Sequence, residues 1–205
     1  AAYYDITTSY ATSTPLRGDA NTAAIAQMKD FIATTIAQFK TDGNFANLTS
    51  GDITTMGFDK GRKEALKIGY LIASSRQTVS YIYTAYADTL GAHGNIFFHT
   101  FNFDTETGAA LTLADLFVPN ASYLDSLSSI ARAKLPTVIG DDFDINFIKD
   151  GTTPDEKNFK NFFFDNQEFV ILFDPYAVAA YSFGPQTLRI PLNQLSTILK
   201  TEYRQ

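Results

Sequence analysis

Histidine is the side chain that most often acts as a general base, and the chain has only two, His93 and His99. A catalytic triad needs a nucleophile beside such a base, yet no Gly-x-Ser-x-Gly sequence is present. The chain has no cysteine, which excludes thiolate nucleophiles, disulfides and thiolate metal sites. Paired carboxylates of a glycosidase stay open, because the chain has 22 Asp and Glu residues whose separation a sequence does not show, but nothing marks a particular pair. We therefore predict no catalytic residues.

Metal ligands are also sparse in this sequence. His93 and His99 are six residues apart on a predicted strand, which puts them on one face about 20 Å apart, too far to share one ion. An acidic run begins at Asp142 like a calcium loop, but Phe147 replaces the required glycine and Thr153 the bidentate glutamate. We therefore expect no metal ion and no other cofactor.

The overall charge argues against nucleic acid as a partner. The chain has 22 acidic and 16 basic side chains and a formal net charge of -6, so its field repels phosphate backbones. The same field would attract a basic protein, although a mildly acidic surface also serves solubility alone. Its 205 residues, 45% of them hydrophobic and 19% charged, are typical of one large or two small globular domains.

The ends and apolar runs bear on the compartment. No run approaches the roughly 18 apolar residues of a membrane-spanning helix, so we expect no transmembrane segment within these residues. The chain starts at Ala1 without an initiator methionine and without the layout of a signal peptide. We expect it to begin downstream of a removed leader or an anchor.

The elements that must position any site follow from residue patterns. Thr, Val, Ile, Tyr and Phe dominate several stretches with partial alternation, whereas other stretches repeat apolar residues at helical spacing. Strands are predicted at 3–12, 68–75, 78–87, 96–103, 159–164, 169–173 and 187–190, and helices at 21–39, 121–135 and 193–200. The stretch 44–63 is predicted as a polar loop, and the second helix is predicted to end before Pro136. This order predicts an α+β fold of antiparallel sheets packed against a few helices.

Several short sequences then occur in a characteristic order. They are GAHGN at 91–95, FNFD at 101–104, LTLADLF at 111–117, FDPYAVAAYSFG at 173–184 and IPL at 190–192. With them the chain resembles the extracytoplasmic region of RsiV-like anti-sigma factors, which sense lysozyme, and the related module of PdaC-type peptidoglycan deacetylases. The resemblance implies two small α+β modules that share an interface, at residues 1–105 and 106–205. It also implies an extracytoplasmic domain that presents a surface to lysozyme or to cell-wall material.

The same resemblance directs attention to an aromatic segment near the C-terminal end. Tyr176 and Tyr181 combine rigid ring area with hydroxyl groups, which suits both protein interfaces and stacking on sugar rings. The alternative is a structural role, because tyrosines in a corner between strands are commonly buried. His93 lies between glycines that could serve the turn alone. The predicted partner-binding residues are Pro175, Tyr176, Tyr181, Phe183, His93 and Asn95.

Three functions remain open from the sequence. The first is a non-enzymatic binding module for a protein such as lysozyme, steered by the acidic surface. The second is a carbohydrate-binding or peptidoglycan-associated accessory domain that uses the same aromatic residues. The third, a hydrolase with dispersed carboxylates, has the least support. These residues include no sigma-binding region, so the sequence assigns no signalling role.

Overall fold

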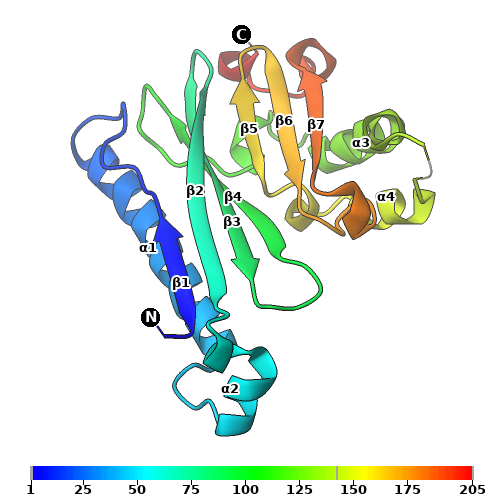
Figure 1. Ribbon diagram of the computed structural model, residues 1–205. Helices are drawn as coiled ribbons and strands as arrows, with labels where there is room; N and C mark the ends of the chain where they lie inside the picture. The colour runs from blue at the N-terminus through cyan, green and yellow to red at the C-terminus, as the bar shows by residue number, and fades with distance from the viewer. Residues whose placement is uncertain (1, 142, 205) are drawn as a thin grey trace.

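The computed structural model describes residues 2–141 and 143–204 and contains two sheets with helices packed against them. Figure 1 shows the sheets side by side, with α1 (Gly18–Asp42) along the first and α3 (Tyr123–Ile139) behind the second. The predicted α+β class is confirmed. None of the described helices combines the length and the apolarity that crossing a membrane requires.

The first sheet has the strand order β1-β2-β3-β4. Its strands are β1 (Tyr4–Thr8), β2 (Glu64–Ser74), β3 (Thr78–Asp88) and β4 (Asn95–Asp104). The last three form the predicted antiparallel meander, with Tyr83 opposite Tyr70 and His99. The β1 strand pairs parallel with β2. A parallel pair needs a long crossover, which the segment containing α1 supplies.

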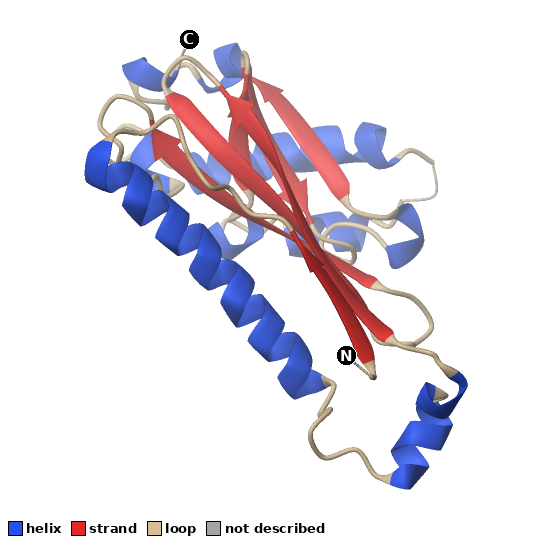
Figure 2. Cartoon of the chain, turned by 60° about the vertical axis from the view of Figure 1, so that its left-hand side comes forward, coloured by secondary structure: helices blue, strands red, loops and turns tan. Residues whose placement is uncertain are grey.

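Helix α1 covers one face of this sheet, as Figure 2 shows. Its buried residues are Ala24, Met28, Ile32 and Phe39, whose spacing places them on one side of the helix. They pack against alternate residues of the strands, which include Leu66, Ile68, Tyr81, Tyr83 and Phe103. The apolar stripe predicted for this helix therefore faces the sheet.

The second sheet has the order β5-β6-β7 and is antiparallel throughout. Its strands are β5 (Phe162–Asp165), β6 (Glu168–Phe173) and β7 (Gln186–Pro191). The predicted hairpin is confirmed, with Asn166 at a φ of 54° in its turn. One face packs on α3 through a core that includes Phe164, Phe169, Ile171, Leu188, Leu127 and Leu135.

The two sheets meet through a small apolar cluster and a few polar contacts. Ile82 of β3 packs with Phe163 and Val170 of the second sheet. The Asn102 side chain donates from Nδ2 to the carbonyl oxygen of Phe162 at 2.9 Å. The two larger core clusters draw their buried residues from 11–103 and from 113–203. The division of the chain into modules at 105/106 stays a prediction.

Several predicted boundaries were wrong. The polar stretch after α1 contains α2 (Ser50–Met56), which starts with a reciprocal Thr49–Asp52 capping box and buries no residue. Helix α3 continues through Pro136 to Ile139. The predicted closing helix is absent from the described residues, which fold there into a short 3₁₀ turn followed by a bridge between Phe117 and Leu199. The 3₁₀ turns lie at Phe58–Lys60, Ala114–Leu116, Glu156–Asn158, Tyr181–Phe183, Leu192–Leu195 and Thr201–Tyr203.

The acidic run at 141–146 leads into one more helix, α4 (Ile145–Gly151). Asp144 caps it, because its Oδ1 accepts from the backbone N–H of Asn146 at 2.8 Å. Asp142, where the calcium-like pattern begins, lies outside the described residues.

Candidate functional site

Three of the predicted binding residues form one aromatic group, which we call the ring corner: His93, Tyr176 and Tyr181. The His93 and Tyr181 rings stack with centroids 3.6 Å apart and planes 18° from parallel. The Tyr176 ring lies 5.5 Å from that of Tyr181 and 6.5 Å from that of His93. His93 comes from the loop between β3 and β4, and the tyrosines come from the connection between β6 and β7. The fold thus joins residues far apart in the sequence.

Part of the ring corner is fixed, whereas Tyr176 is open to solvent. The Tyr181 hydroxyl donates to the carbonyl oxygen of Gly94 at 2.5 Å, which ties the two loops together. A Cβ added to Gly94 would lie 2.4 Å from the Tyr86 ring, so the His93 loop packs closely on β3. Tyr176 is 55% exposed. The corner therefore presents one accessible tyrosine against a fixed pair of stacked rings.

The backbone at the ring corner is strained. Five described non-glycine residues have positive φ, and three of them are asparagines, which tolerate this region. The other two are Leu90, at 59°, and Tyr176, at 69°. They lie in the two loops that form the corner. A left-handed conformation costs an ordinary L-residue about 1–2 kcal/mol, and such outliers cluster at functional sites.

The other predicted residues make no ring contact with this corner among the described residues. Pro175 is half-buried beside Tyr176. Phe183 is half-buried, and its carbonyl oxygen accepts from Nε2 of Gln186 at 2.7 Å. Asn95 begins β4 and lines a separate apolar groove of about 470 Å³ between α1 and the first sheet. Asn95 lines this groove, although it directly follows Gly94, whose carbonyl oxygen accepts from the Tyr181 hydroxyl.

The two histidines lie in different surroundings. His93 is exposed, and its Nδ1 lies 3.1 Å from the carbonyl oxygen of Gly94. His99 stacks on Phe31 of α1 at 4.5 Å, and burial, with a smaller effect of Lys160, lowers the pKa of its imidazole. Neither imidazole contacts a serine hydroxyl or a carboxylate among the described residues. The same part of the chain holds no group of three or more His, Cys, Asp or Glu side chains placed to bind a metal ion.

A second feature adjoins the ring corner. A cavity of about 200 Å³, called here the polar pocket, lies between the segment 157–161 and the turn 174–177. The turn is closed by a hydrogen bond from Ala177 N–H to the Asp174 carbonyl oxygen at 3.0 Å, and it carries Tyr176. The polar pocket is lined by residues that include Lys157, Asn158, Lys160, Asn161, Asp174 and Ala177.

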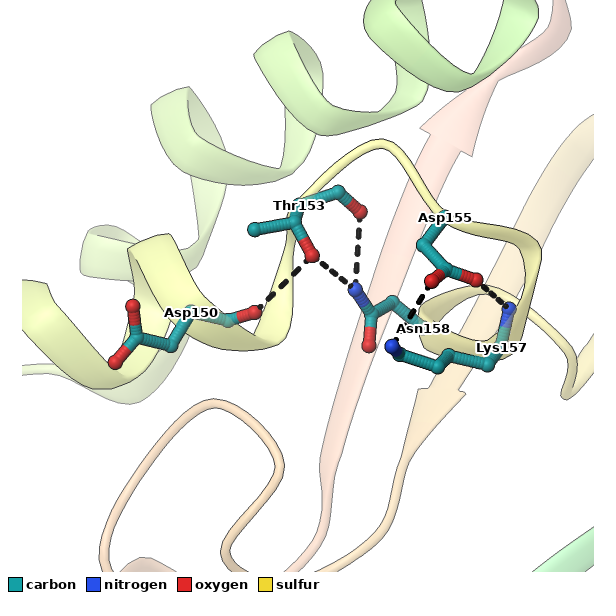
Figure 3. Close-up of polar contacts among 5 residues, drawn as sticks. All are labelled: Asp150, Thr153, Asp155, Lys157 and Asn158. Carbon is teal, nitrogen blue, oxygen red and sulfur yellow. Dashed lines mark hydrogen bonds and ion pairs between the residues drawn. The ribbon is translucent and has the colours of Figure 1, made fainter.

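One wall of the polar pocket is held by its own hydrogen bonds, which Figure 3 shows. Asn158 donates from Nδ2 to the carbonyl oxygen of Thr153 at 3.0 Å and to its Oγ1 at 2.7 Å. The Lys157 ammonium lies 2.9 Å from Oδ2 of Asp155, and Asp155 also accepts from the Lys157 backbone N–H. The ammonium of Lys157 is therefore neutralised locally.

The opposite wall is anchored to both sheets and to α4. Asp174 Oδ1 accepts from the backbone N–H of Phe98 in β4 at 2.8 Å, and burial raises the pKa of this carboxyl group. A Cβ added to Gly151 would lie 1.8 Å from the carbonyl oxygen of Ala177. The turn that presents Tyr176 is therefore packed directly on the end of α4.

The polar pocket was missed by sequence reasoning. Lys160 and Asn161 directly precede the apolar run of β5 and look like the ordinary polar start of a strand. No spacing rule connects them to Asp174 in the next strand connection. A buried polar side chain inside a phenylalanine-rich stretch was the one available signal.

Comparison with known proteins first finds a family that is similar to part of this chain. Residues 114–193 match the family described as "Protein of unknown function (DUF3298)". The matched segment contains the second sheet and both tyrosines of the ring corner, whereas His93 and Asn95 lie outside it. The similarity to this family thus concerns residues 114–193 of the chain.

A particular relative is the peptidoglycan-N-acetylmuramic acid deacetylase PdaC of Bacillus subtilis (strain 168). The two are 34% identical over 143 residues, which make up 69% of this chain and 31% of the relative. The chain therefore spans less than a third of that protein. The predicted resemblance to a module of PdaC-type deacetylases is confirmed, whereas the resemblance to RsiV-like anti-sigma factors stays a prediction.

Two solved structures support the fold. A DUF3298 family protein from Pseudomonas aeruginosa PAO1 aligns with a TM-score of 0.54 at 18% identity, covering 76% of this chain and 71% of that one. A DUF3298 family member from Bacteroides fragilis NCTC 9343 aligns with a TM-score of 0.56 at 18% identity, covering 88% and 73%. At this identity the similarity concerns the fold alone.

Proposed function

We propose that this chain is a non-catalytic, extracytoplasmic binding domain whose ring corner holds glycan strands of peptidoglycan. The observation that carries the proposal is Tyr176, an exposed ring on a strained backbone beside the stacked His93 and Tyr181 rings. A residue of this size keeps a left-handed conformation only where the surrounding structure enforces it. Placement of a ring for contact with a ligand explains that strain.

The chemistry of the corner suits a sugar. The faces of a pyranose ring carry C–H groups that pack on aromatic faces, while its hydroxyl groups need hydrogen-bond partners. Tyr176 offers both a ring face and a hydroxyl. The Tyr181 ring is already held by its bond to Gly94, so little side-chain entropy is lost when a ligand binds it.

The comparisons support the choice of polymer. The relative is named for an activity on the N-acetylmuramic acid of peptidoglycan, and this chain aligns with less than a third of it. A domain that keeps such an enzyme on its polymer would be useful without being catalytic. The same role would place the chain outside the cytoplasm, in the cell envelope.

A second candidate is a protein partner such as lysozyme. The observation that favours it is the formal net charge of -6, which attracts a basic protein and speeds its association. In that case the ring corner would supply the aromatic contact of a protein interface.

Co-sedimentation with purified insoluble peptidoglycan tests the first candidate. The wild-type chain should pellet with the polymer, and Tyr176→Ala should weaken binding roughly fivefold, equivalent to about 1 kcal/mol of lost stacking. The matched control is Tyr10→Ala, because Tyr10 is 46% exposed and lies on the first sheet's side of the molecule beside Lys29. This variant should pellet like the wild type.

A lysozyme arm separates the two candidates. Immobilised lysozyme should not retain the chain at physiological salt if the ring corner binds glycan. Retention that depends on Tyr176, without any pelleting by peptidoglycan, would favour the protein partner instead. Pelleting that is equal for the wild type and both tyrosine variants would refute binding at the ring corner.

A further inference from the structure

The polar pocket contains a buried amide without a partner. Asn161 is only 4% exposed, and its side chain makes no hydrogen bond to any residue that the structure describes. Among the described residues, Glu64 Oε2 and Tyr83 Oη are fully enclosed and have no hydrogen-bond partner. The polar side-chain atoms of Asn161 also have no partner within the described part of the chain but are not fully enclosed. The Asn161 amide is therefore close-packed on most sides and still reachable from the polar pocket that it lines.

Such an amide depends on the polar pocket for its hydrogen bonds. No described residue satisfies it, so its partners can only be water or a ligand in the polar pocket, whereas most buried polar groups have a partner. An apolar residue of similar size would fill the same space without needing such a partner. The arrangement is explained if the amide is kept for a ligand that occupies the polar pocket.

The charges around Asn161 favour a neutral ligand. Lys160 has no ion pair among the described residues, but Asp174 lines the same pocket. Lys157 is paired with Asp155 at 2.9 Å. The two cations and two anions cancel, so the polar pocket has no net charge with which to hold a free anion or cation.

The groups that remain form a set of donors and acceptors. Asn161 offers both an N–H donor and a carbonyl acceptor, and Lys160 offers further donors. Asp174 uses Oδ1 for the Phe98 N–H, which leaves Oδ2 as an acceptor. A ligand group that matches this set has one carbonyl oxygen and one N–H, which is the composition of a secondary amide.

Size and position narrow the choice further. A volume of about 200 Å³ is below the roughly 300–1,000 Å³ of sites that enclose a whole small molecule, so the polar pocket suits one substituent. Ala177 and Phe173 supply apolar lining that could contact a methyl group. The polar pocket shares the turn 174–177 with Tyr176, so its occupant can belong to a ligand that also reaches the ring corner.

We propose that the polar pocket binds the acetamido group of an N-acetylated sugar, with Asn161 and Lys160 donating to its carbonyl oxygen and Asp174 accepting from its N–H. The choice of a sugar rests on the function proposed above. The recognised chemistry is the secondary amide, so the domain would distinguish N-acetylated glycans from glycans that carry a hydroxyl group in the same position.

Calorimetric titration of the whole chain with two neutral ligands tests this inference. The ligands are β-1,4-linked oligomers of N-acetylglucosamine and of glucose, of equal length, which differ in the acetamido group. The wild type should bind the N-acetylated oligomer about tenfold more tightly. Asn161→Leu should lose most of this preference, with little change in the binding of the glucose oligomer, whereas Tyr176→Ala should weaken the binding of both.

Each outcome decides a different point. Equal affinity of the wild type for the two oligomers would overturn the inference and leave binding at the ring corner standing. No binding of either oligomer would overturn both proposals. Thermal unfolding of Asn161→Leu supplies an independent readout: a midpoint equal to or above that of the wild type is expected, because the unpaired amide is removed. A large loss of stability would show that Asn161 has a structural role and would refute the inference.

Discussion

The strained backbone of Tyr176 makes a prediction whose sign is unusual. In most of a protein, alanine is more stable than glycine by about 0.5–1 kcal/mol, because glycine loses more backbone entropy on folding. Tyr176 has a φ of 69°, where a Cβ atom costs about 1–2 kcal/mol. The strain relieved by removing the Cβ should outweigh the larger backbone entropy that glycine loses on folding. Tyr176→Gly should therefore be more stable than Tyr176→Ala by about 0.5–1 kcal/mol.

The comparison isolates the backbone because both variants lose the same side chain. Each removes the ring contacts to Tyr181 and His93, so that loss cancels between them. Urea unfolding should give equal m-values and different midpoints. For a chain of this length the difference corresponds to roughly 1–4 °C in the melting temperature. Both variants should lose peptidoglycan binding to the same extent.

Tyr10 supplies the control for this order. It is exposed, and it is not among the described residues with positive φ. Tyr10→Ala should therefore be at least as stable as Tyr10→Gly, which reverses the order expected at position 176. If Tyr176→Ala proved as stable as Tyr176→Gly, the backbone strain at the ring corner would be refuted, and with it the inference that the fold enforces the position of this ring.

Three further predictions concern other contacts. Gly151→Ala should displace the turn at Ala177, lowering both the melting temperature and peptidoglycan binding, and an unchanged affinity would contradict the close packing. Burial, together with a neighbouring carboxylate, raises the pKa of Glu64 above 4.5, so ionisation of Glu64 destabilises the folded state as pH rises. In urea unfolding, Glu64→Gln should therefore be more stable than the wild type at pH 7. This gain in stability should shrink below pH 4.5. Burial alone would raise the pKa of Asp104, but hydrogen bonds, including those from Thr107, lower it below 3.8. The ionised Asp104 therefore stabilises the folded state at neutral pH, and this stabilisation is lost in acid. Asp104→Asn should cost about 1–3 kcal/mol at pH 7 and progressively less below pH 3.8, and a constant difference across this range would refute the assignment.

Sequence patterns predicted those elements whose burial is periodic. The α1 stripe, the β2-β3-β4 meander and the β5-β6 hairpin were predicted because each buries one face against a core. Helix α2 was missed because it buries no side chain and therefore has no apolar period. The prediction of a closing helix at 193–200 was wrong because Leu199 pairs with Phe117, a contact that no local pattern reveals.

The candidate site was predictable in part, for a related reason. Exposed tyrosines in a loop and a histidine between glycines can be recognised from residue type alone. Their assembly depends on a hydrogen bond between Tyr181 and Gly94, which are 87 positions apart, and on the stacking of His93 against the same ring. The role of Asn161 depends on which neighbours it lacks, and a sequence does not contain that information.

The most direct measurement of glycan binding at the ring corner is the NMR signal of the two imidazole rings during titration with soluble peptidoglycan fragments. His93 is exposed and stacks on Tyr181, whereas His99 packs against Phe31 of α1, away from the ring corner. Binding at the ring corner predicts that the His93 signals shift to saturation and by more than those of His99. Saturable binding with an unmoved His93 would contradict it.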